Sequence, residues 1–105
     1  MVIVETPIFT RRIQATLRDE EYRHLQNHLV NRPDSGKLMP GSGGLRKLRW
    51  ATGGHGKRGG IRVIYYWFVS QETILLLFAY PKSEQDNLTR DQLKQLKKII
   101  EGEYR

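Results

Sequence analysis

The sequence predicts an α+β fold: a mostly antiparallel sheet of about four strands, with two helices near the start of the chain and one at its end. β-type segments follow one another between residues 45 and 80 with only short connections, as expected of antiparallel strands. Helical patterns lie before and after them, and we expect these helices to gather on one face of the sheet. Because the chain has 105 residues and no Pro-rich linker, we expect a single domain over residues 1–105.

A short strand and two helices are predicted in the first third of the chain. The β-branched segment VIVE at residues 2–5 favours a strand. Thr6 and Pro7 then suit a helix start, because threonine caps the first turn and proline fits the first helical position. This helix has an apolar side formed by Phe9, Ile13 and Leu17. A second helix begins at Arg18 or the next residue, stops before Pro33, and has an apolar side formed by Tyr22, Leu25 and Leu29.

The strands in the middle of the chain differ in which of their faces are apolar. In LRKLRWA, Leu48 and Trp50 fall on one face. Lys47 and Arg49 fall on the other. Residues 38–42 are expected to form a loop or a short irregular edge, and the glycine-rich TGGHGKRGG a hairpin loop to the strand IRVIYYWFV. The segment ETILLLFAY is apolar on both faces and therefore belongs in the middle of a covered sheet.

The last element is predicted to be a helix that begins at Thr89. Thr89 and Gln92 form a TxxQ capping box, in which each side chain binds the backbone amide of the other residue. Apolar residues recur at helical spacing on one side, namely Leu96, Ile99 and Ile100. The outward side is cationic, with Lys94, Lys97 and Lys98.

The formal net charge of +7 comes from one third of the chain, residues 36–70. Before this window five cations balance five acids, and after it six cations balance six acids. The window itself contains no acid and seven cations: Lys37, Arg46, Lys47, Arg49, Lys57, Arg58 and Arg62. A field of one sign on a small protein attracts polyanions and speeds their encounter. Nucleic acid is therefore the partner that the composition favours most.

The composition and the motifs exclude several classes of protein and site. Without cysteine there is no disulfide, thiolate metal site or thiol nucleophile, which fits a reducing cytoplasm. The opening is too short and too soon acidic for a signal peptide, and no apolar run approaches a membrane span, so we expect a cytoplasmic protein that binds no membrane. His24 and His28 have the spacing of a zinc pair but lack a third ligand, so we expect no metal and no cofactor. GGHGKRGG is not a P-loop, because Ala51 stands where glycine is needed and Arg58 where a hydroxyl is needed.

Cations on adjoining strands form the candidate site. Alternation makes Lys47 and Arg49 project from one face about 7 Å apart, a spacing comparable to that of neighbouring RNA phosphates. Arg62, at the start of the next strand, lies beside them if the two strands pair in register. The alternative is a solvated sheet face whose long cations only shield aliphatic surface. Lys82, which directly follows the apolar strand, is a further candidate because it sits at a strand end.

The rest of the acid-free window supplies candidate RNA contacts. Lys57 and Arg58 can contact a phosphate backbone, since the glycines around them allow close approach. His55 can carry a proton near neutral pH. We expect RNA-binding contacts from Arg46, Lys57, Arg58 and His55.

Three stretches of the chain resemble the RelE/ParE toxin superfamily, and within it the HigB-like toxins of type II toxin–antitoxin systems. They are ETPIF…DEEYR, GSGGLRKLRWATGGHGKRGGIRVIYYW and AYPKSEQDNLT. The resemblance implies a RelE-like sheet flanked by helices and an mRNA interferase that cleaves translated mRNA in the A site of the 70S ribosome without a metal. It also implies a cognate HigA-like antitoxin, with operator DNA contacted only through the antitoxin complex.

The resemblance implies a catalytic set formed by Lys47, Arg49, Arg62 and Lys82. We expect the two arginines to hold phosphate oxygens and Lys47 to take the proton of the 2′-hydroxyl, a step that crowding by other cations favours. Lys82 is expected to bind phosphate or transfer a proton. The sequence departs from the family at two positions. Ser83 stands where the family has an arginine, and Thr89 stands near the position of a tyrosine that is associated with catalysis in the family. The candidate replacements are Tyr65, Tyr66 and Tyr80.

Two other functions fit the same features. A ParE-like protein has this fold but poisons DNA gyrase by binding it. A non-catalytic RNA-binding module uses its cations only to neutralise phosphates, so its affinity falls with salt. Cleavage only during translation, inhibition of gyrase, and plain salt-sensitive binding of RNA distinguish the three functions.

Overall fold

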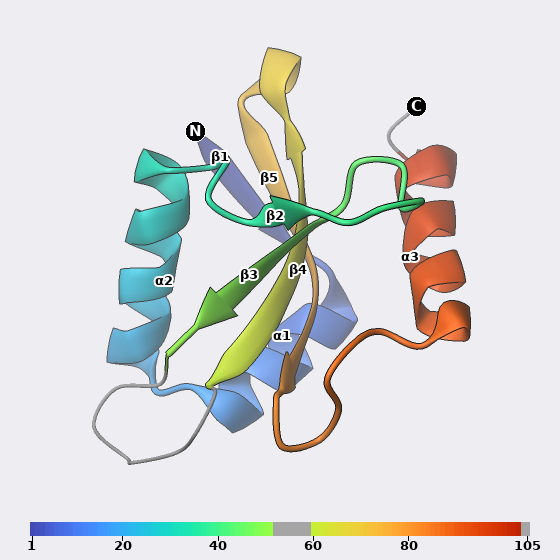
Figure 1. The fold of residues 1–105 in the computed structure, drawn as a ribbon. Coiled ribbons are helices and arrows are strands. Elements are labelled where there is room, and N and C mark those ends of the chain that lie inside the picture. Colours follow the sequence, from blue (N-terminus) through green and yellow to red (C-terminus); the bar gives the residue numbers. More distant parts are fainter. Residues whose placement is uncertain (52–59, 104–105) are drawn as a thin grey trace.

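The computed structural model, which describes residues 1–51 and 60–103, has an α+β fold with a five-stranded sheet between helices (Figure 1). The elements are β1 (Val2–Glu5), α1 (Pro7–Thr16), α2 (Asp19–Asn31), β2 (Lys37–Leu38), β3 (Arg46–Trp50), β4 (Ile61–Phe68), β5 (Thr73–Pro81) and α3 (Arg90–Glu103), with a 3₁₀ turn at Val69–Gln71. The strand order is β1-β5-β4-β3-β2. All pairs are antiparallel except β1 with β5, which is parallel. The predicted fold class is confirmed, with β2 as an additional short edge strand.

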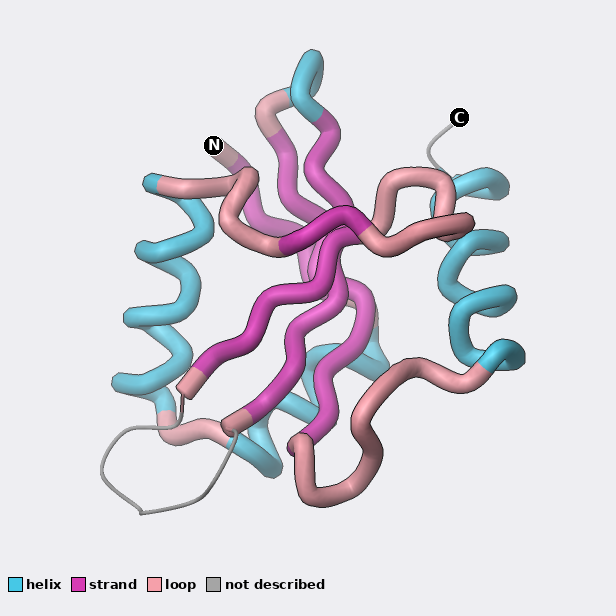
Figure 2. Tube along the Cα trace, viewed as in Figure 1, coloured by secondary structure: helices cyan, strands magenta, loops and turns pink. Residues whose placement is uncertain are grey.

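β5 lies between β1 and β4 and is covered on both faces, as its sequence predicts. Its residues from Ile74 to Tyr80 are all buried. One face packs against α1 and α2 through a cluster that includes Phe9 and Leu25, and the other packs against α3 through Leu96 and Ile100. Figure 2 shows α2 and α3 on opposite sides of the sheet. The expectation that the helices gather on one face is therefore wrong, because a strand that is apolar on both sides needs cover on both.

Side-chain caps start α1 and α3 where the sequence predicts them. The Phe9 amide donates a hydrogen bond to Thr6 Oγ1 at 3.2 Å, and Pro7 occupies the first helical position. At α3 the Thr89 amide donates to Gln92 Oε1 and the Gln92 amide donates to Thr89 Oγ1, both at 3.0 Å. This reciprocal capping box satisfies two backbone donors and fixes the direction in which α3 leaves the preceding loop.

β1 pairs only with the first half of β5, and the start of α1 satisfies the rest of that edge. The Thr6 amide donates to the Leu76 carbonyl and Thr6 Oγ1 donates to the Leu77 carbonyl, both at 3.1 Å. Further along, Arg12 Nη1 donates to the Ala79 carbonyl at 3.4 Å. Buried backbone carbonyls without partners are costly. These contacts therefore allow β5 to extend beyond β1 to its last residues.

The Tyr65 hydroxyl ties the sheet to the connection between α2 and β2. It accepts a hydrogen bond from the Gly36 amide at 2.8 Å and donates one to the Pro33 carbonyl at 2.7 Å. The ring is fully buried on the face covered by α1 and α2. Burial raises the pKa of the Tyr65 hydroxyl, so it stays protonated and can donate. Gly36 leaves no room for a side chain, since an added Cβ would lie 2.7 Å from the Tyr65 ring.

Replacing Tyr65 with phenylalanine is expected to lower the free energy of unfolding by about 1–3 kcal/mol, because one buried and one partly buried backbone group lose their partner. Urea unfolding followed by circular dichroism measures the loss. Tyr66→Phe is the matched control, since Tyr66 is half-buried on the other face and its hydroxyl makes no hydrogen bond within the described residues. Equal losses in the two variants would contradict this role for the Tyr65 hydroxyl.

Candidate active site

The register of three strands brings predicted cations together on the side of the sheet where α3 lies. β3 pairs with β4 so that Arg49 stands opposite Arg62, and β4 pairs with β5 so that Arg62 stands opposite Tyr80. Lys47 precedes Arg49 by two residues and projects from the same face. Leu48 between them is buried in the cluster under α1 and α2. We call Lys47, Arg49 and Arg62 the cationic face.

Lys47 is held by the loop between β5 and α3, residues 82–89, which we call the β5–α3 loop. Its Nζ donates a hydrogen bond to Asn87 Oδ1 at 2.9 Å. The two residues are 40 positions apart, so this contact joins the strand to a distant loop. Lys47 is half-buried, whereas Arg49 is exposed. A positioned amine beside an accessible guanidinium suits the binding of a phosphate group.

Arg62 and Tyr80 form the buried floor of the cationic face. Arg62 is only 5% exposed, and its Nη1 donates to the Ile61 carbonyl at 3.4 Å. Tyr80 is fully buried, and its hydroxyl has no hydrogen-bond partner within the described residues. Burial raises the pKa of Tyr80, although the positive charge of Arg62 opposes this rise and Asp86 adds to it. The hydroxyl therefore stays protonated at neutral pH, where it can donate a proton or a hydrogen bond but cannot act as a base.

Lys82 is the first residue of the β5–α3 loop, and the backbone on both sides of it is fixed. Its amide donates to the Gly60 carbonyl at 3.1 Å, which continues the sheet beyond the end of β5. Two residues later, Glu84 forms an ion pair with Arg12 of α1 at 2.9 Å. The side chain of Lys82 is exposed. The loop therefore presents this lysine beside the start of β4, the strand that carries the buried arginine.

Arg46 lies on the opposite face of β3 from Lys47. It donates to the carbonyls of Asp34 at 3.1 Å and Gly36 at 2.8 Å, and its guanidinium carbon lies 6.0 Å from the centre of the Trp67 ring. These contacts stabilise the connection between α2 and β2. The structure does not bring Arg46 together with the cationic face, and the alternation of β3 is the sequence signal that separates them.

The other predicted RNA contacts, His55, Lys57 and Arg58, lie outside the described residues, as does most of the predicted hairpin loop. The strands on either side of that segment are described. β3 and β4 pair antiparallel from Arg46 with Tyr65 to Trp50 with Ile61, as a hairpin requires. The predicted pairing of these two strands is therefore confirmed.

Among the candidate tyrosines, Tyr80 alone stands in line with Arg49 and Arg62. Tyr65 projects from the opposite face. Tyr66 lies farther along β4, with its ring centre 4.4 Å from that of Phe68. The structure thus singles out one tyrosine near the cations.

The histidine pair of α2 lies apart from these groups. His24 is exposed, and the half-buried ring of His28 has its centre 5.2 Å from that of Trp50. Within residues 1–51 and 60–103, no group of three or more His, Cys, Asp or Glu side chains could hold a metal ion. The same ranges contain no helix that is long and apolar enough to cross a membrane.

Sequence reasoning missed the residues that hold the site in place, namely Arg12, Glu84 and Asn87. Each acts through a contact between distant parts of the chain, so no local pattern marks it.

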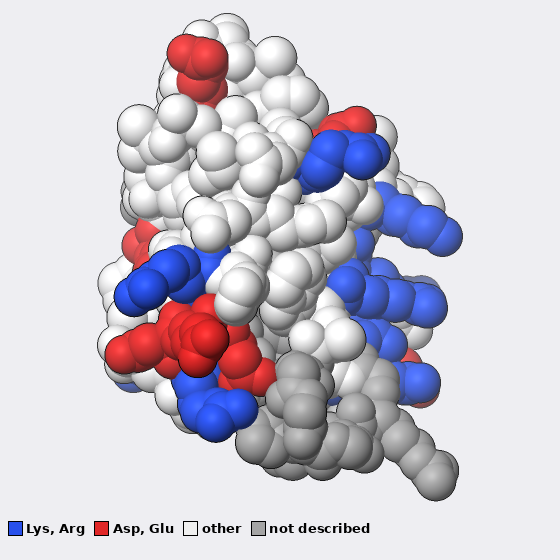
Figure 3. Space-filling view, turned by 90° about the vertical axis from the view of Figure 1, so that its left-hand side faces the viewer, with Lys and Arg blue, Asp and Glu red and all other residues white. Residues whose placement is uncertain are grey.

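The distribution of charge is visible on the surface. Figure 3, viewed from the α2 side, shows Asp and Glu among Lys and Arg on the left and a column of Lys and Arg along the right-hand margin.

A comparison with protein families gives a match over nearly the whole chain. The matching model is described as the RelE toxin of the RelE/RelB toxin–antitoxin system, and it covers residues 3–103. The matched region begins in β1 and includes the strands of the cationic face, the β5–α3 loop and α3. The chain therefore belongs to the RelE family of toxins of toxin–antitoxin systems.

Proposed function

We propose that this toxin is a metal-independent endoribonuclease, an mRNA interferase that cleaves translated mRNA in the ribosomal A site and so inhibits translation. The observation that carries the proposal is the register of β3 and β4, which places Arg49 opposite Arg62 with Lys47 on the same face. RelE toxins are generally endoribonucleases, which supports the proposal that this toxin cleaves RNA. We further propose the HigB-like branch, a HigA-like antitoxin, contact with operator DNA only through that antitoxin, a cytoplasmic location, and one domain over residues 1–105.

RNA carries its own nucleophile, the 2′-hydroxyl, so the protein has to supply geometry, charge and proton transfer. The 2′-oxygen attacks phosphorus and forms a new bond to it while the bond from phosphorus to the 5′-oxygen breaks. The 2′-proton passes to a base and another proton passes to the leaving 5′-oxygen. The pentacoordinate transition state carries extra negative charge on its phosphate oxygens. Donors fixed around those oxygens before the reaction stabilise it most.

The residues divide these tasks according to their position. Arg49 and Arg62 can each present two N–H groups to the phosphate oxygens, and Arg62 does so from a buried site where charge interactions are strong. Lys47, held by Asn87, takes the proton of the 2′-hydroxyl through the lone pair of its neutral amine form. Lys82, exposed at the end of β5, binds the phosphate and donates a proton to the 5′-oxygen.

Truncating Arg49 to alanine is expected to slow cleavage of a translated reporter message about 10²- to 10³-fold, as loss of a fixed charge-stabilising donor does. Lys47→Ala and Arg62→Ala are expected to do the same and to restore growth to cells that express the toxin. Primer extension on the message measures the rate. Arg11→Ala is the matched control, because Arg11 is exposed on α1 and outside the cationic face.

The same assay separates the alternative functions. Wild-type protein that inhibits DNA gyrase and leaves the message intact would place the chain with ParE-like toxins. Salt-sensitive RNA binding without cleavage would make it a binding module. Folded variants of Lys47, Arg49 and Arg62 that all remain toxic would contradict the assignment of the site, and thermal unfolding of each variant verifies that it is folded.

Lys82→Gln is expected to slow cleavage at least about 10²-fold, because the leaving oxygen loses its acid. Tyr80→Phe is expected to stay within about tenfold of the wild-type rate and to fold normally, since a buried hydroxyl without a partner adds no stability. Single-turnover cleavage across a range of pH compares the two variants. The opposite order of the two losses would transfer the role of proton donor from Lys82 to Tyr80.

A further inference from the structure

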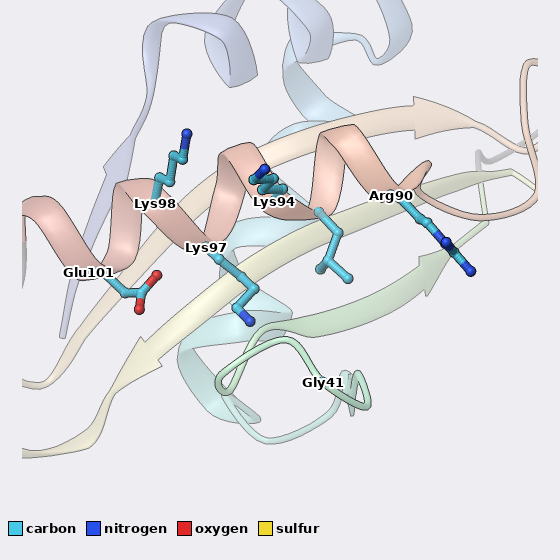
Figure 4. Close-up of a pocket in the computed structure, with 7 residues that line it drawn as sticks. Gly41, Arg90, Lys94, Lys97, Lys98 and Glu101 are labelled. Atoms are coloured by element: carbon cyan, nitrogen blue, oxygen red, sulfur yellow. The ribbon is translucent and has the colours of Figure 1, made fainter.

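A second concentration of positive charge lies along α3, outside the residues assigned to cleavage. It lines an open groove of about 340 Å³ between α3 and the loop that follows β2. Figure 4 shows the residues that line it, which include Gly41, Arg90, Lys94, Lys97, Lys98 and Glu101. Cations therefore outnumber acids among these lining residues, and the groove attracts anions.

The far wall of the groove is held in shape by Ser42. Its Oγ donates to the Met39 carbonyl at 2.6 Å and accepts from the Leu45 amide at 3.0 Å, and the residue is almost fully buried. Gly41 at the rim has a φ of +69° and nothing within 4 Å of its Cβ position. The Lys97 side chain extends from α3 toward this loop (Figure 4). The groove is thus formed by ordered backbone on one side and a regular helix on the other.

The spacing of the cations fits a chain of phosphates better than a single small anion. Arg90, Lys94 and Lys97 follow one another at helical intervals, about 5 Å along the axis for each turn. From the first to the last they span roughly 10 Å, enough for two or three consecutive phosphates. Small-molecule sites enclose most of their ligand, whereas this groove is open along its length.

The β5–α3 loop connects the cationic face to the start of the groove. Lys47 contacts Asn87 of the β5–α3 loop at 2.9 Å, and α3 begins three residues later at Arg90. The capping box of Thr89 fixes the direction of the helix from that point. A nucleic acid strand that leaves the cationic face past Lys47 therefore meets the groove next. Glu101 lies at the far end, where its charge disfavours a further phosphate.

We propose that this groove binds the sugar–phosphate backbone of single-stranded RNA that flanks the cleavage position. The choice of RNA as the ligand rests on the proposed function. Lysine side chains bind phosphates as point charges and read no base edges, so the groove adds affinity without sequence preference. The groove also holds the RNA in register with Arg49 of β3 and Arg62 of β4.

The test measures binding of a 2′-O-methyl RNA of roughly 10 nucleotides, a length typical of single-strand sites. This probe lacks the nucleophile and cannot be cleaved. Fluorescence anisotropy at several salt concentrations gives Kd and its salt dependence for wild type and for Lys94→Gln/Lys97→Gln. Lys94→Arg/Lys97→Arg keeps the charge. Arg11→Gln/Arg23→Gln is the matched control, because it removes two exposed charges from α1 and α2.

The glutamine pair is expected to reduce the log–log salt slope by about 1.4 and to weaken binding about 25-fold at roughly 0.1 M salt, from about 0.7 per phosphate contact. The arginine pair and the α1/α2 control should match wild type. Equal losses in the glutamine pair and the control, or no loss in the glutamine pair, would overturn the proposal. So would an oligoglutamate peptide that depends on Lys94 and Lys97 while RNA does not, since the occupant would then be an acidic protein segment.

Failure of this proposal can be told from failure of the proposed function. Wild type that cleaves translated messages but binds the probe independently of Lys94 and Lys97 contradicts only the groove. Wild type that binds the probe through these lysines and never cleaves a message contradicts only the nuclease.

Discussion

The burial of β5 on both faces is the constraint on which the rest of the structure depends. The seven consecutive residues from Ile74 to Tyr80 are all buried, so neither face of this strand can be left open to solvent. One layer of helices is therefore not enough. α1 and α2 cover one face and α3 covers the other. The β5–α3 loop connects the end of β5 to the helix that covers this second face. It is also the segment that contacts Lys47 and carries Lys82.

The proposed function rests on an asymmetry between the two covered faces. On the α1 and α2 side, Arg46 and the Tyr65 hydroxyl form hydrogen bonds with backbone groups at and near Gly36. On the α3 side, cations of β3 and β4 stand in register and those of α3 continue the charge away from the sheet. The loop between these two groups is anchored at Glu84 by Arg12. Positively charged groups held in place before substrate arrives need little reorganisation during reaction, which is the condition for strong electrostatic stabilisation.

Local sequence patterns predicted the fold class, the helix caps and the sharing of one face by Lys47 and Arg49, because these depend on short-range periodicity. They could not predict which face α3 covers, since periodicity marks a helix's apolar side but not the surface that receives it. The contact of Lys47 with Asn87 joins positions 40 residues apart and has no local signal. Arg46 and Arg49 are the same type of residue on the same strand. Only the face from which each side chain projects, which alternation implies, separates them.

The most direct test of the account is to map the cleavage of a message translated by purified 70S ribosomes, with and without a single 2′-deoxynucleotide at the scissile position in the A-site codon. We expect cleavage of the all-ribose message only during translation, in the presence of a metal chelator that leaves the ribosome intact, and a product that ends in a 2′,3′-cyclic phosphate. We expect no cleavage at the deoxy position. Cleavage of the deoxy-substituted message at the same position would contradict attack by the 2′-hydroxyl, and with it the chemistry assigned to the cationic face.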